Sequence, residues 1–400
     1  MDLVDRSLFQ IMNRRRIRLV HVITGLDAGG AETMLAKLLR GLDQELFSNE
    51  VISLTNIGPI GSELRNCGFE VTALGMRRGL PSPLGVLKLF YLFGKSPPDV
   101  VVTWMYHADL IGGTVARLCG IDNLCWIIRH GNLDTDKNKL LTILTAKACA
   151  ALSSLVPSRI LCNSKAGLQT HRNFGYLEEK LSVIPNGFET GEFFPDEKIR
   201  KKIRKSLGID DDRFVFGNVG RFDPQKNHAG LLDSLALVLK HNPRAMLVCC
   251  GREVSLENEE IRERVEKLNL HSNVLFLGFR QDVSHLFNAF DTYVSSSLGE
   301  GFSNSIGEAM ATGVPCVVTD VGDSMELVGS TGWSVDPGCH FKLAEGMNEA
   351  LLDSPSELLR KGSLARQRII EVFSIKSVTF ESYFDLDIIQ WTKIKWLPNT

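Results

Sequence analysis

Short runs of apolar residues alternate with amphipathic stretches along most of this 400-residue sequence, starting at Ile17. Such alternation is typical of parallel β-sheets whose crossover helices cover both faces. A first series of strands is expected at 17–23, 50–54, 70–74, 100–103, 124–128, 160–162 and 181–184, with helices at 31–41, 84–93, 108–118, 137–155 and 165–173. These elements complete one doubly wound domain.

A polar and charged stretch, 186–213, separates this series from a second one. Here strands are expected at 214–219, 245–250, 274–277, 292–295 and 316–318, and helices at 228–239, 255–268, 283–290 and 306–312. The sequence therefore predicts an α/β protein with two Rossmann-like domains, 1–188 and 189–373. Open sheets of this kind bind ligands at the carboxyl ends of their strands, so we expect the active site in a cleft between the domains.

The composition narrows the function classes. A formal net charge of −2 argues against general nucleic-acid binding, which normally needs a strongly basic chain. The nine cysteines show no C-x-x-C spacing and lie mostly in apolar runs, which indicates small core residues in a reducing compartment. The N-terminus lacks the order of a signal peptide, and Lys88 and Lys147 interrupt the two longest apolar runs. We therefore expect a cytoplasmic protein.

One segment, 77–95, has features that would suit contact with the inner face of a membrane. Residues 77–95 are basic at both ends and very apolar in the middle, as a membrane-surface segment requires. A helix of a doubly wound domain also needs an apolar face, so an ordinary core helix is the favoured alternative.

Two carboxylates, Glu300 and Glu308, flank a small-residue turn that opens a helix. Gly301 allows close approach of the backbone to a ligand, and the next N–H groups would point at an anion together with the positive end of the helix: Phe302, Ser303 and Asn304. Glu300 is suited to sugar hydroxyls and Glu308 to a ribose diol, since a carboxylate accepts several hydrogen bonds. The alternative, a Ser305-x-x-Glu308 capping box, needs no ligand.

Two cations follow the first strand of the second domain. Arg221 and Lys226 lie between that strand and the next helix. A guanidinium grips phosphate oxygens in a fork and an ammonium adds a mobile charge, so together they suit a diphosphate. The alternative is a solvated loop with surface charges, which is the favoured interpretation of any isolated pair of this kind.

These motifs resemble those of the retaining glycosyltransferases of family four, which have the two-domain GT-B fold. The resemblance rests on the E-x7-E spacing of Glu300 and Glu308, the G-R-x4-K-N pattern of Arg221 and Lys226, and I-P-N-G at 184–187, in the family's order. It implies transfer of a sugar from a UDP-, GDP- or ADP-sugar to a hydroxyl of a saccharide, polysaccharide precursor or glycolipid, with retention of configuration and without a metal. It also implies that a C-terminal helix, about 374–400, returns to the first domain.

The resemblance also assigns roles to single residues. Glu300 would orient the donor sugar, Glu308 would hold the ribose, and the two cations would bind the diphosphate. The loop with Gly29 and Gly30 would face that diphosphate, although it does not match the dinucleotide fingerprint. The segment 278–282 would hold the base through Phe279 and Arg280, with an ordinary turn capped by Asp282 as the alternative.

Two histidines lie at strand ends of the first domain, where a structural role is the more common one. By similarity, His130 would contact the donor sugar and diphosphate at the reaction centre, and His107 would lie nearer the acceptor. The sequence around His130 departs from the usual family versions. The D-x-D of Asp134 and Asp136 is interpreted as a surface turn, and no His/Cys cluster has zinc spacing, so no metal is expected.

Two other function classes are alternatives to sugar transfer. One is a catalytically idle protein that binds a nucleotide sugar or serves as a scaffold. The other is a different GT-B reaction, such as epimerisation or phosphorolysis. The intact acidic and basic motifs argue against the first, and the lack of a lysine in a phosphorylase-cofactor context argues against the second.

Overall fold

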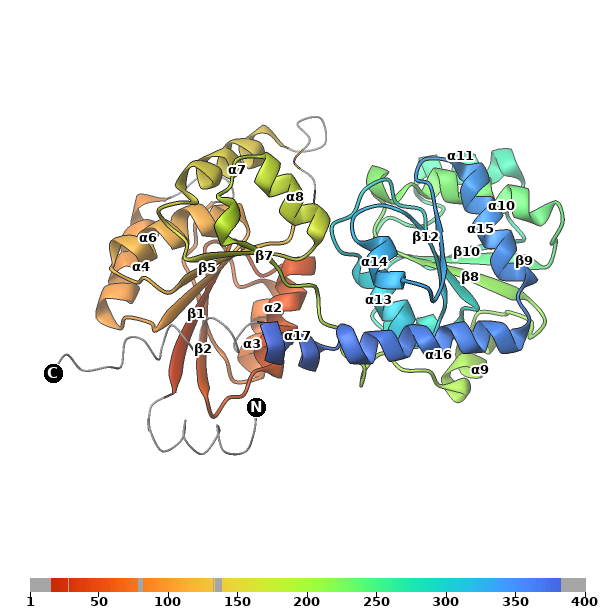
Figure 1. The fold of residues 1–400 in the computed structure, drawn as a ribbon. Coiled ribbons are helices and arrows are strands. Elements are labelled where there is room, and N and C mark those ends of the chain that lie inside the picture. The colour runs from red at the N-terminus through yellow and green to blue at the C-terminus, as the bar shows by residue number, and fades with distance from the viewer. Residues whose placement is uncertain (1–15, 28, 78–81, 132, 134–138, 383–400) are drawn as a thin grey trace. The chain divides into compact units, whose positions relative to one another are not determined.

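The computed structural model describes residues 16–27, 29–77, 82–131, 133 and 139–382. Contacts divide the chain into two units. Unit 1 runs to Pro185 and takes up the chain again at Val378, and unit 2 is Asn186–Ser377. Each unit is a parallel β-sheet with helices on both faces (Figure 1), which confirms the predicted fold class of two Rossmann-like domains.

The sheet of unit 1 has seven strands in the order β3-β2-β1-β4-β5-β6-β7. The order reverses between β1 and β4, so this is the switch point of the sheet. Central strands such as β4 and β5 are buried along their whole length because helices cover both faces. The strands are β1 Ile17–Ile23, β2 Phe47–Ser53, β3 Glu70–Ala73, β4 Val100–Trp104, β5 Leu124–Ile128, β6 Arg159–Cys162 and β7 Leu181–Val183.

The helix predicted at 108–118 is broken into short pieces, with the π-helix η1 at Asp109–Gly113. A Cβ on Gly112 would lie 2.8 Å from Val22, and one on Gly113 would lie 2.5 Å from Trp126, so the two glycines let η1 rest directly on the sheet. The other helical segments begun in unit 1 are α2 Gly30–Gly41, α3 Gly58–Asn66, α4 Pro83–Lys95, α5 Tyr106–Ala108, α6 Thr114–Leu118, α7 Leu140–Leu152, α8 Lys165–Asn173 and η2 Glu178–Lys180.

Unit 2 has six parallel strands in the order β10-β9-β8-β11-β12-β13, with its switch point between β8 and β11. The short edge strand β13 was not predicted, because its middle residue is an exposed serine and it forms no run of apolar residues. The strands are β8 Phe214–Val219, β9 Ala245–Cys250, β10 Val274–Phe276, β11 Thr292–Ser295, β12 Cys316–Thr319 and β13 Trp333–Val335.

The polar stretch predicted to separate the domains contains a helix of unit 2. Two arginines of α9 are not solvated: Arg200 and Arg204, whose side chains are 27% and 4% exposed, both bind the Asp291 carboxylate, at 2.5 and 2.7 Å. No helix was predicted at 197–206, because its charged residues were taken as solvated. The remaining helices are α9 Glu197–Ser206, η3 Pro224–Lys226, α10 His228–Leu239, α11 Glu259–Leu268, α12 Val283–Leu286, η4 Phe287–Ala289, α13 Asn304–Ala311, α14 Ser324–Val328, α15 His340–Leu352, α16 Pro355–Val372 and α17 Ile375–Ser382.

Within the described ranges, no helix combines the length and apolar character needed to cross a bilayer. Six of the nine cysteines are buried, in agreement with their prediction as small core residues. Of the predicted C-terminal helix, α17 covers Ile375–Ser382, and the rest lies outside the described residues.

Candidate active site

Three loops of unit 2 meet the carboxyl ends of β8, β11 and β12. They are residues 220–227, 296–303 and 320–323. The first two follow the strands at the switch point of the sheet, where ligands of doubly wound proteins bind. Half of the predicted donor-binding residues lie on these loops, and so does Glu300.

An ion pair joins the first two loops. The Lys226 Nζ donates to Oε1 of Glu300, and Ser297 Oγ donates to the same oxygen at 2.7 Å. The Lys226 side chain is 24% exposed and that of Glu300 is 12% exposed, so solvent screens the pair only partly. The sequence predicted both residues at the site but not their pairing, and it missed Ser297.

Hydrogen bonds to backbone carbonyls also hold the same two loops together. The Leu298 N–H donates to the Gln225 carbonyl at 2.7 Å, and Ser296 Oγ donates to the Lys226 carbonyl at 2.8 Å. Lys226 and Glu300 therefore project from one connected piece of backbone, which limits the rotamers in which they meet.

The third loop clamps the turn at Glu300. A Cβ on Gly322 would lie 2.5 Å from the carbonyl oxygens of both Glu300 and Gly301, and the Asp323 N–H donates to the Gly301 carbonyl at 3.0 Å. Gly322 also has a φ of +58°, which favours glycine. A glycine shortly after a strand was the sequence signal that could have drawn attention to Gly322. Its contact with the Glu300 backbone could not be predicted from spacing.

Helix α13 begins at Asn304, two residues before the predicted start. Its N-cap is Ser303, whose side chain makes no capping bond, and Ser305 accepts a hydrogen bond from the Tyr293 hydroxyl at 2.8 Å. The capping-box alternative is therefore wrong, since Ser305 lies inside the helix. Glu308 lies one turn further along α13 and is half-buried.

The Phe302 side chain is a core residue. It is 7% exposed, and its ring stacks on Phe188 with centroids 6.2 Å apart. A Cβ on Gly307 would lie 2.0 Å from the Phe188 ring, so α13 also packs closely on this aromatic. The Phe302 side chain thus anchors the turn in the core of unit 2. Only the backbone N–H of Phe302 remains for the predicted contact with an anion.

Arg221 projects from the loop after β8 with a side chain that is 69% exposed. Its Nε and Nη2 donate to Asp223 Oδ2 at 3.1 and 2.8 Å. Partial burial would raise the pKa of the Asp223 carboxyl, but hydrogen bonds from the Gln225 N–H and from Arg221 outweigh it and hold that pKa below its usual value. The guanidinium is therefore oriented, although it remains accessible to an anion.

A buried histidine lies behind Lys226. His228 starts α10, its ring stacks on Phe222 with centroids 5.6 Å apart, and neither ring nitrogen has a partner among the residues the structure describes. Burial, and then the nearby Lys226 charge, lower the pKa of His228 to about 4. The ring is therefore neutral, and Lys226 is not repelled by a second cation.

The segment predicted to hold the base follows β10. Phe279 is 61% exposed, and the Arg252 guanidinium lies 5.4 Å from its ring centroid. Arg280 donates to both carboxylate oxygens of Asp282, at 2.8 and 2.5 Å. Asp282 is the N-cap residue of α12, although its side chain makes no capping bond.

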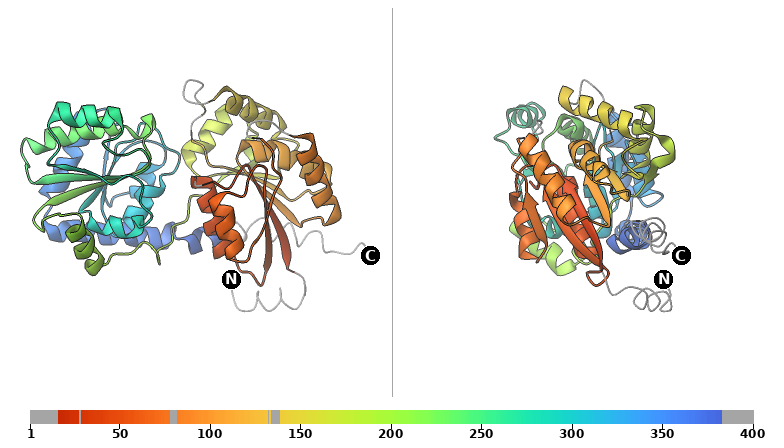
Figure 2. Two further views of the ribbon diagram at one scale, coloured as in Figure 1. Left: turned by 180° about the vertical axis from the view of Figure 1, so that it is seen from behind. Right: turned by 90° about the vertical axis from the view of Figure 1, so that its left-hand side faces the viewer.

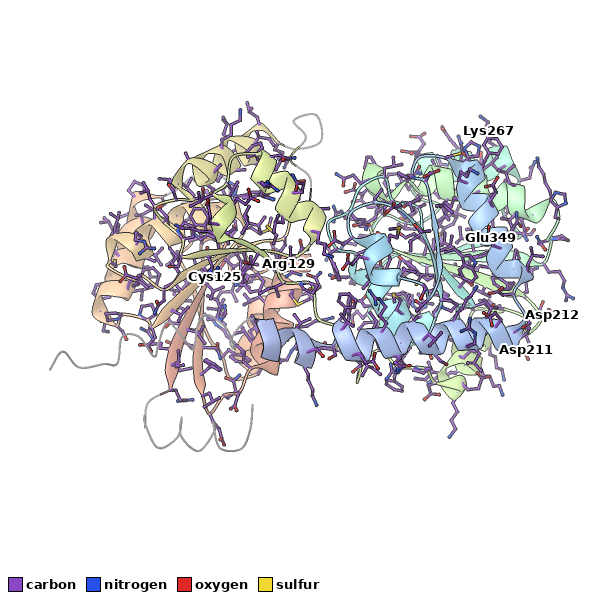
Figure 3. The ribbon with its side chains drawn as sticks, in the orientation of Figure 1. Cys125, Arg129, Asp211, Asp212, Lys267 and Glu349 are labelled. Carbon is purple, nitrogen blue, oxygen red and sulfur yellow. The ribbon has the colours of Figure 1, made fainter. Side chains whose placement is uncertain are left out.

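Unit 1 places its predicted residues after neighbouring strands. Gly29 and Gly30 start α2 after β1, His107 follows β4, and His130 follows β5. Figure 3 labels Cys125 within β5 and Arg129 immediately after it, where the guanidinium lies 6.0 Å from the Trp104 ring. These residues therefore share the carboxyl edge of the seven-stranded sheet.

Both histidines of that edge are neutral at neutral pH. Burial lowers the pKa of His107 and of His130 below the usual value. Within the described part of unit 1, His107 Nε2 and His130 Nδ1 are buried without a hydrogen-bond partner. Met105, two residues before His107, has φ +72° and ψ 157°, a strained conformation of the kind that clusters at functional sites.

A buried acid follows in the same segment. Thr103 Oγ1 donates to Oδ1 of Asp109 at 2.5 Å, and Asp109 Oδ2 has no partner in the described ranges. Burial raises the pKa of Asp109 to about 8, against the opposing effect of the Thr103 hydrogen bond. Asp109 is therefore protonated in the folded chain at neutral pH.

This raised pKa makes stability depend on pH. Below the unfolded pKa of about 3.9, Asp109 is protonated in both states. As the pH rises toward 8, only the unfolded chain releases the proton, so stability falls by about 1.4 kcal/mol per pH unit at most. We expect Asp109→Asn to remove this decline in urea unfolding, whereas Asp122→Asn, at a carboxylate that is 64% exposed, should keep it. Parallel pH profiles for wild type and Asp109→Asn would contradict the assignment.

The D-x-D of Asp134 and Asp136 lies outside the described residues. Among the residues that are described, no group of three His, Cys, Asp or Glu side chains could hold a metal ion.

Two family models match most of the chain. The family described as Glycosyltransferase Family 4 matches residues 28–192, and the family described as Glycosyl transferases group 1 matches residues 199–368. The chain belongs to the GT-B glycosyltransferases of family four. The first match covers most of unit 1 and ends seven residues into unit 2, and the second lies within unit 2 and contains the three loops of the candidate site.

Two relatives of this glycosyltransferase and one solved structure are similar over most of the chain. The capsular polysaccharide biosynthesis glycosyltransferase CapM of Staphylococcus aureus is 28% identical and covers 84% of this chain and 90% of its own. The UDP-Gal:alpha-D-GlcNAc-diphosphoundecaprenol alpha-1,3-galactosyltransferase of Escherichia coli is 28% identical and covers 74% and 81%. The crystal structure of Anabaena Alr3699/HepE in complex with UDP-glucose shares the fold, with a TM-score of 0.80, 22% identity and coverage of 95% and 100%.

Proposed function

We propose that this glycosyltransferase moves a hexose from a nucleoside-diphosphate sugar to a hydroxyl of a saccharide or lipid-linked acceptor in polysaccharide biosynthesis, with retention of configuration and without a metal. The observation that carries the proposal is the Lys226–Glu300 pair at the switch point of unit 2. It sets a fixed cation beside a carboxylate and near the start of α13, as a sugar diphosphate requires. The E. coli relative named for UDP-Gal and a diphosphoundecaprenol acceptor supports this donor and acceptor class.

The largest need for stabilisation in the transition state is at the leaving group, because negative charge develops on the diphosphate. Lys226, Arg221 and the first N–H groups of α13 would stabilise that charge as a preorganised positive potential, with no ion needed. Glu308 would accept hydrogen bonds from the ribose. In unit 1 we assign Gly29, Gly30 and His130 to the donor and His107 to the acceptor.

Retention would follow if the acceptor attacked from the face that the diphosphate leaves, with a departing phosphate oxygen taking the acceptor's proton. Glu300 would orient the donor sugar. Lys226 and Ser297 hold its Oε1 without exhausting the carboxylate, which can accept several hydrogen bonds. Phe279 would supply a face for the base, with the backbone at Arg280 reading its edge.

A donor screen tests the proposal. We expect one sugar nucleotide among UDP-, GDP- and ADP-sugars to raise the thermal unfolding temperature, because a ligand that binds only the folded state stabilises it. Turnover with that donor should release the nucleoside diphosphate in EDTA as fast as with magnesium. Arg221→Ala should slow turnover and leave the unfolding temperature without donor unchanged, since the side chain is 69% exposed. A scaffold would show no turnover to lose, and no shift with any donor would sink the proposal.

A further inference from the structure

One helix layer of unit 1 presents apolar residues to solvent. Helix α4 buries Gly85, Leu89 and Phe93 against the sheet, as the core-helix alternative for 77–95 expected. Its opposite face exposes large apolar side chains: Leu84 at 78%, Leu87 at 63% and Tyr91 at 62%. The core-helix alternative is therefore confirmed for one face of α4, and the other face keeps the exposed apolar pattern on which the membrane-surface prediction rests.

Helix α7 repeats the arrangement. It buries Ile143, Ala146 and Cys149, while Leu140, Leu141 and Leu144 are exposed by 73%, 48% and 51%. Helix α4 packs against α6, and η1 contacts both α6 and α7. These elements share one core with the sheet and lie along one side of it in unit 1 (Figure 1). Helices α2 and α3 lie on the other side of the strands, as the view from behind also shows (Figure 2).

The charge of this layer has one sign. The sequence has no acidic residue between Glu70 and Asp99 or between Asp136 and Glu178, which are the stretches that contain α4 and α7. Its exposed lysines lie on the same faces as the exposed leucines: Lys88, Lys95 and Lys147. An apolar surface set among lysines alone suits a surface that is apolar and anionic.

Unit 2 shows that exposed leucines alone do not produce this pattern. Leu352 at the end of α15 is 86% exposed and Leu359 on α16 is 72% exposed. Their helices also carry acids, such as Glu349 on α15 (Figure 3) and Glu357 on α16. These helices therefore carry both signs of charge, with acids paired to bases on each of them, and lack the purely basic surroundings of the α4 and α7 leucines.

We propose that the exposed face of α4 and α7, which we call the lipid face, docks on an anionic membrane surface. Leucines would enter the headgroup boundary while the lysines meet the anionic headgroups. A second copy of the chain is the weaker occupant, because two such faces would bring lysines against lysines. The docking stands without the sugar transfer, but its use, to bring the enzyme to a lipid-linked acceptor, rests on the proposed function.

Vesicle flotation of the full chain tests the proposal. We expect the wild type to float with vesicles of phosphatidylcholine and phosphatidylserine and to stay at the bottom with phosphatidylcholine alone. Leu87→Ser with Leu144→Ser, and separately Lys88→Glu with Lys147→Glu, should each lower the bound fraction about tenfold. The control, Leu352→Ser with Leu359→Ser, removes two leucines from unit 2 that are even more exposed, and it should float like the wild type.

Four results would overturn the lipid face. They are a wild type that does not float with anionic vesicles, equal binding to neutral vesicles, equal losses in the control, and lysine variants that bind as the wild type does. Loss of dimers in the leucine variant, seen by size exclusion without flotation, would indicate self-association instead. Thermal stabilisation by the donor, measured on the same samples, separates this test from the proposed function, because a protein that binds donor but no vesicle contradicts only the docking.

Discussion

Replacing Lys226 with methionine is expected to lower the turnover number about 10²- to 10³-fold, the usual cost of removing one preorganised charge stabiliser from an active site. Methionine keeps most of the side-chain length and removes the charge. The leaving diphosphate would lose its closest proposed cation in the transition state. We therefore expect kcat to fall more than KM rises, in a steady-state assay with the donor found by thermal shift.

The same change should also weaken the fold, because Glu300 would keep its partly buried carboxylate without a counter-charge. We expect a loss of about 1–3 kcal/mol in urea unfolding. Adding Glu300→Gln should recover part of that stability but none of the turnover, since the double variant removes the uncompensated charge without restoring the cation.

Lys201→Met is the control for the lysine change. Lys201 lies on α9 with a side chain that is 75% exposed, paired only loosely with Glu197 at 3.8 Å. It should change neither turnover nor stability measurably. If Lys226→Met turned over donor at the wild-type rate, the assignment of this lysine to the diphosphate would be wrong.

Replacing Gly322 with alanine is expected to slow turnover about 10- to 100-fold, because small displacements of catalytic groups carry costs of that size. The added Cβ would lie 2.5 Å from the carbonyl oxygens of Glu300 and Gly301. Backbone cannot rotate away as a side chain can, so the turn that carries Glu300 must shift. The change alters no group that we place against the donor.

The positive φ of Gly322 would add strain of about 1–2 kcal/mol to the folded state, and a second glycine isolates that cost. Gly208 has a φ of +66°, and a Cβ there would meet nothing within 4 Å. Gly208→Ala should therefore lower the thermal unfolding temperature and leave turnover intact. A Gly322→Ala enzyme no slower than Gly208→Ala would show that the clamp on Glu300 has no role in catalysis.

The strands of both units were the most predictable part of the fold. Parallel strands covered on both faces become continuous apolar runs, and β5, β8 and β9 begin and end at the predicted residues. Helix α9 was not predicted, because two of its arginines, Arg200 and Arg204, bind Asp291, which lies far from them in the sequence. Helix α13 was shifted because Tyr293, and not the helix terminus, takes up the Ser305 hydroxyl.

By itself, the sequence determined the fold class, the family and the residue types that a sugar diphosphate needs. These follow from local burial patterns and from motifs a few residues long. Only the tertiary structure decided that Lys226 pairs with Glu300, that Gly322 clamps that turn, and that Asp109 is buried deeply enough to keep a proton. The physical reason is that strand order brings together loops that lie far apart along the chain, and one-dimensional periodicity records whether a residue is buried but not what it meets there.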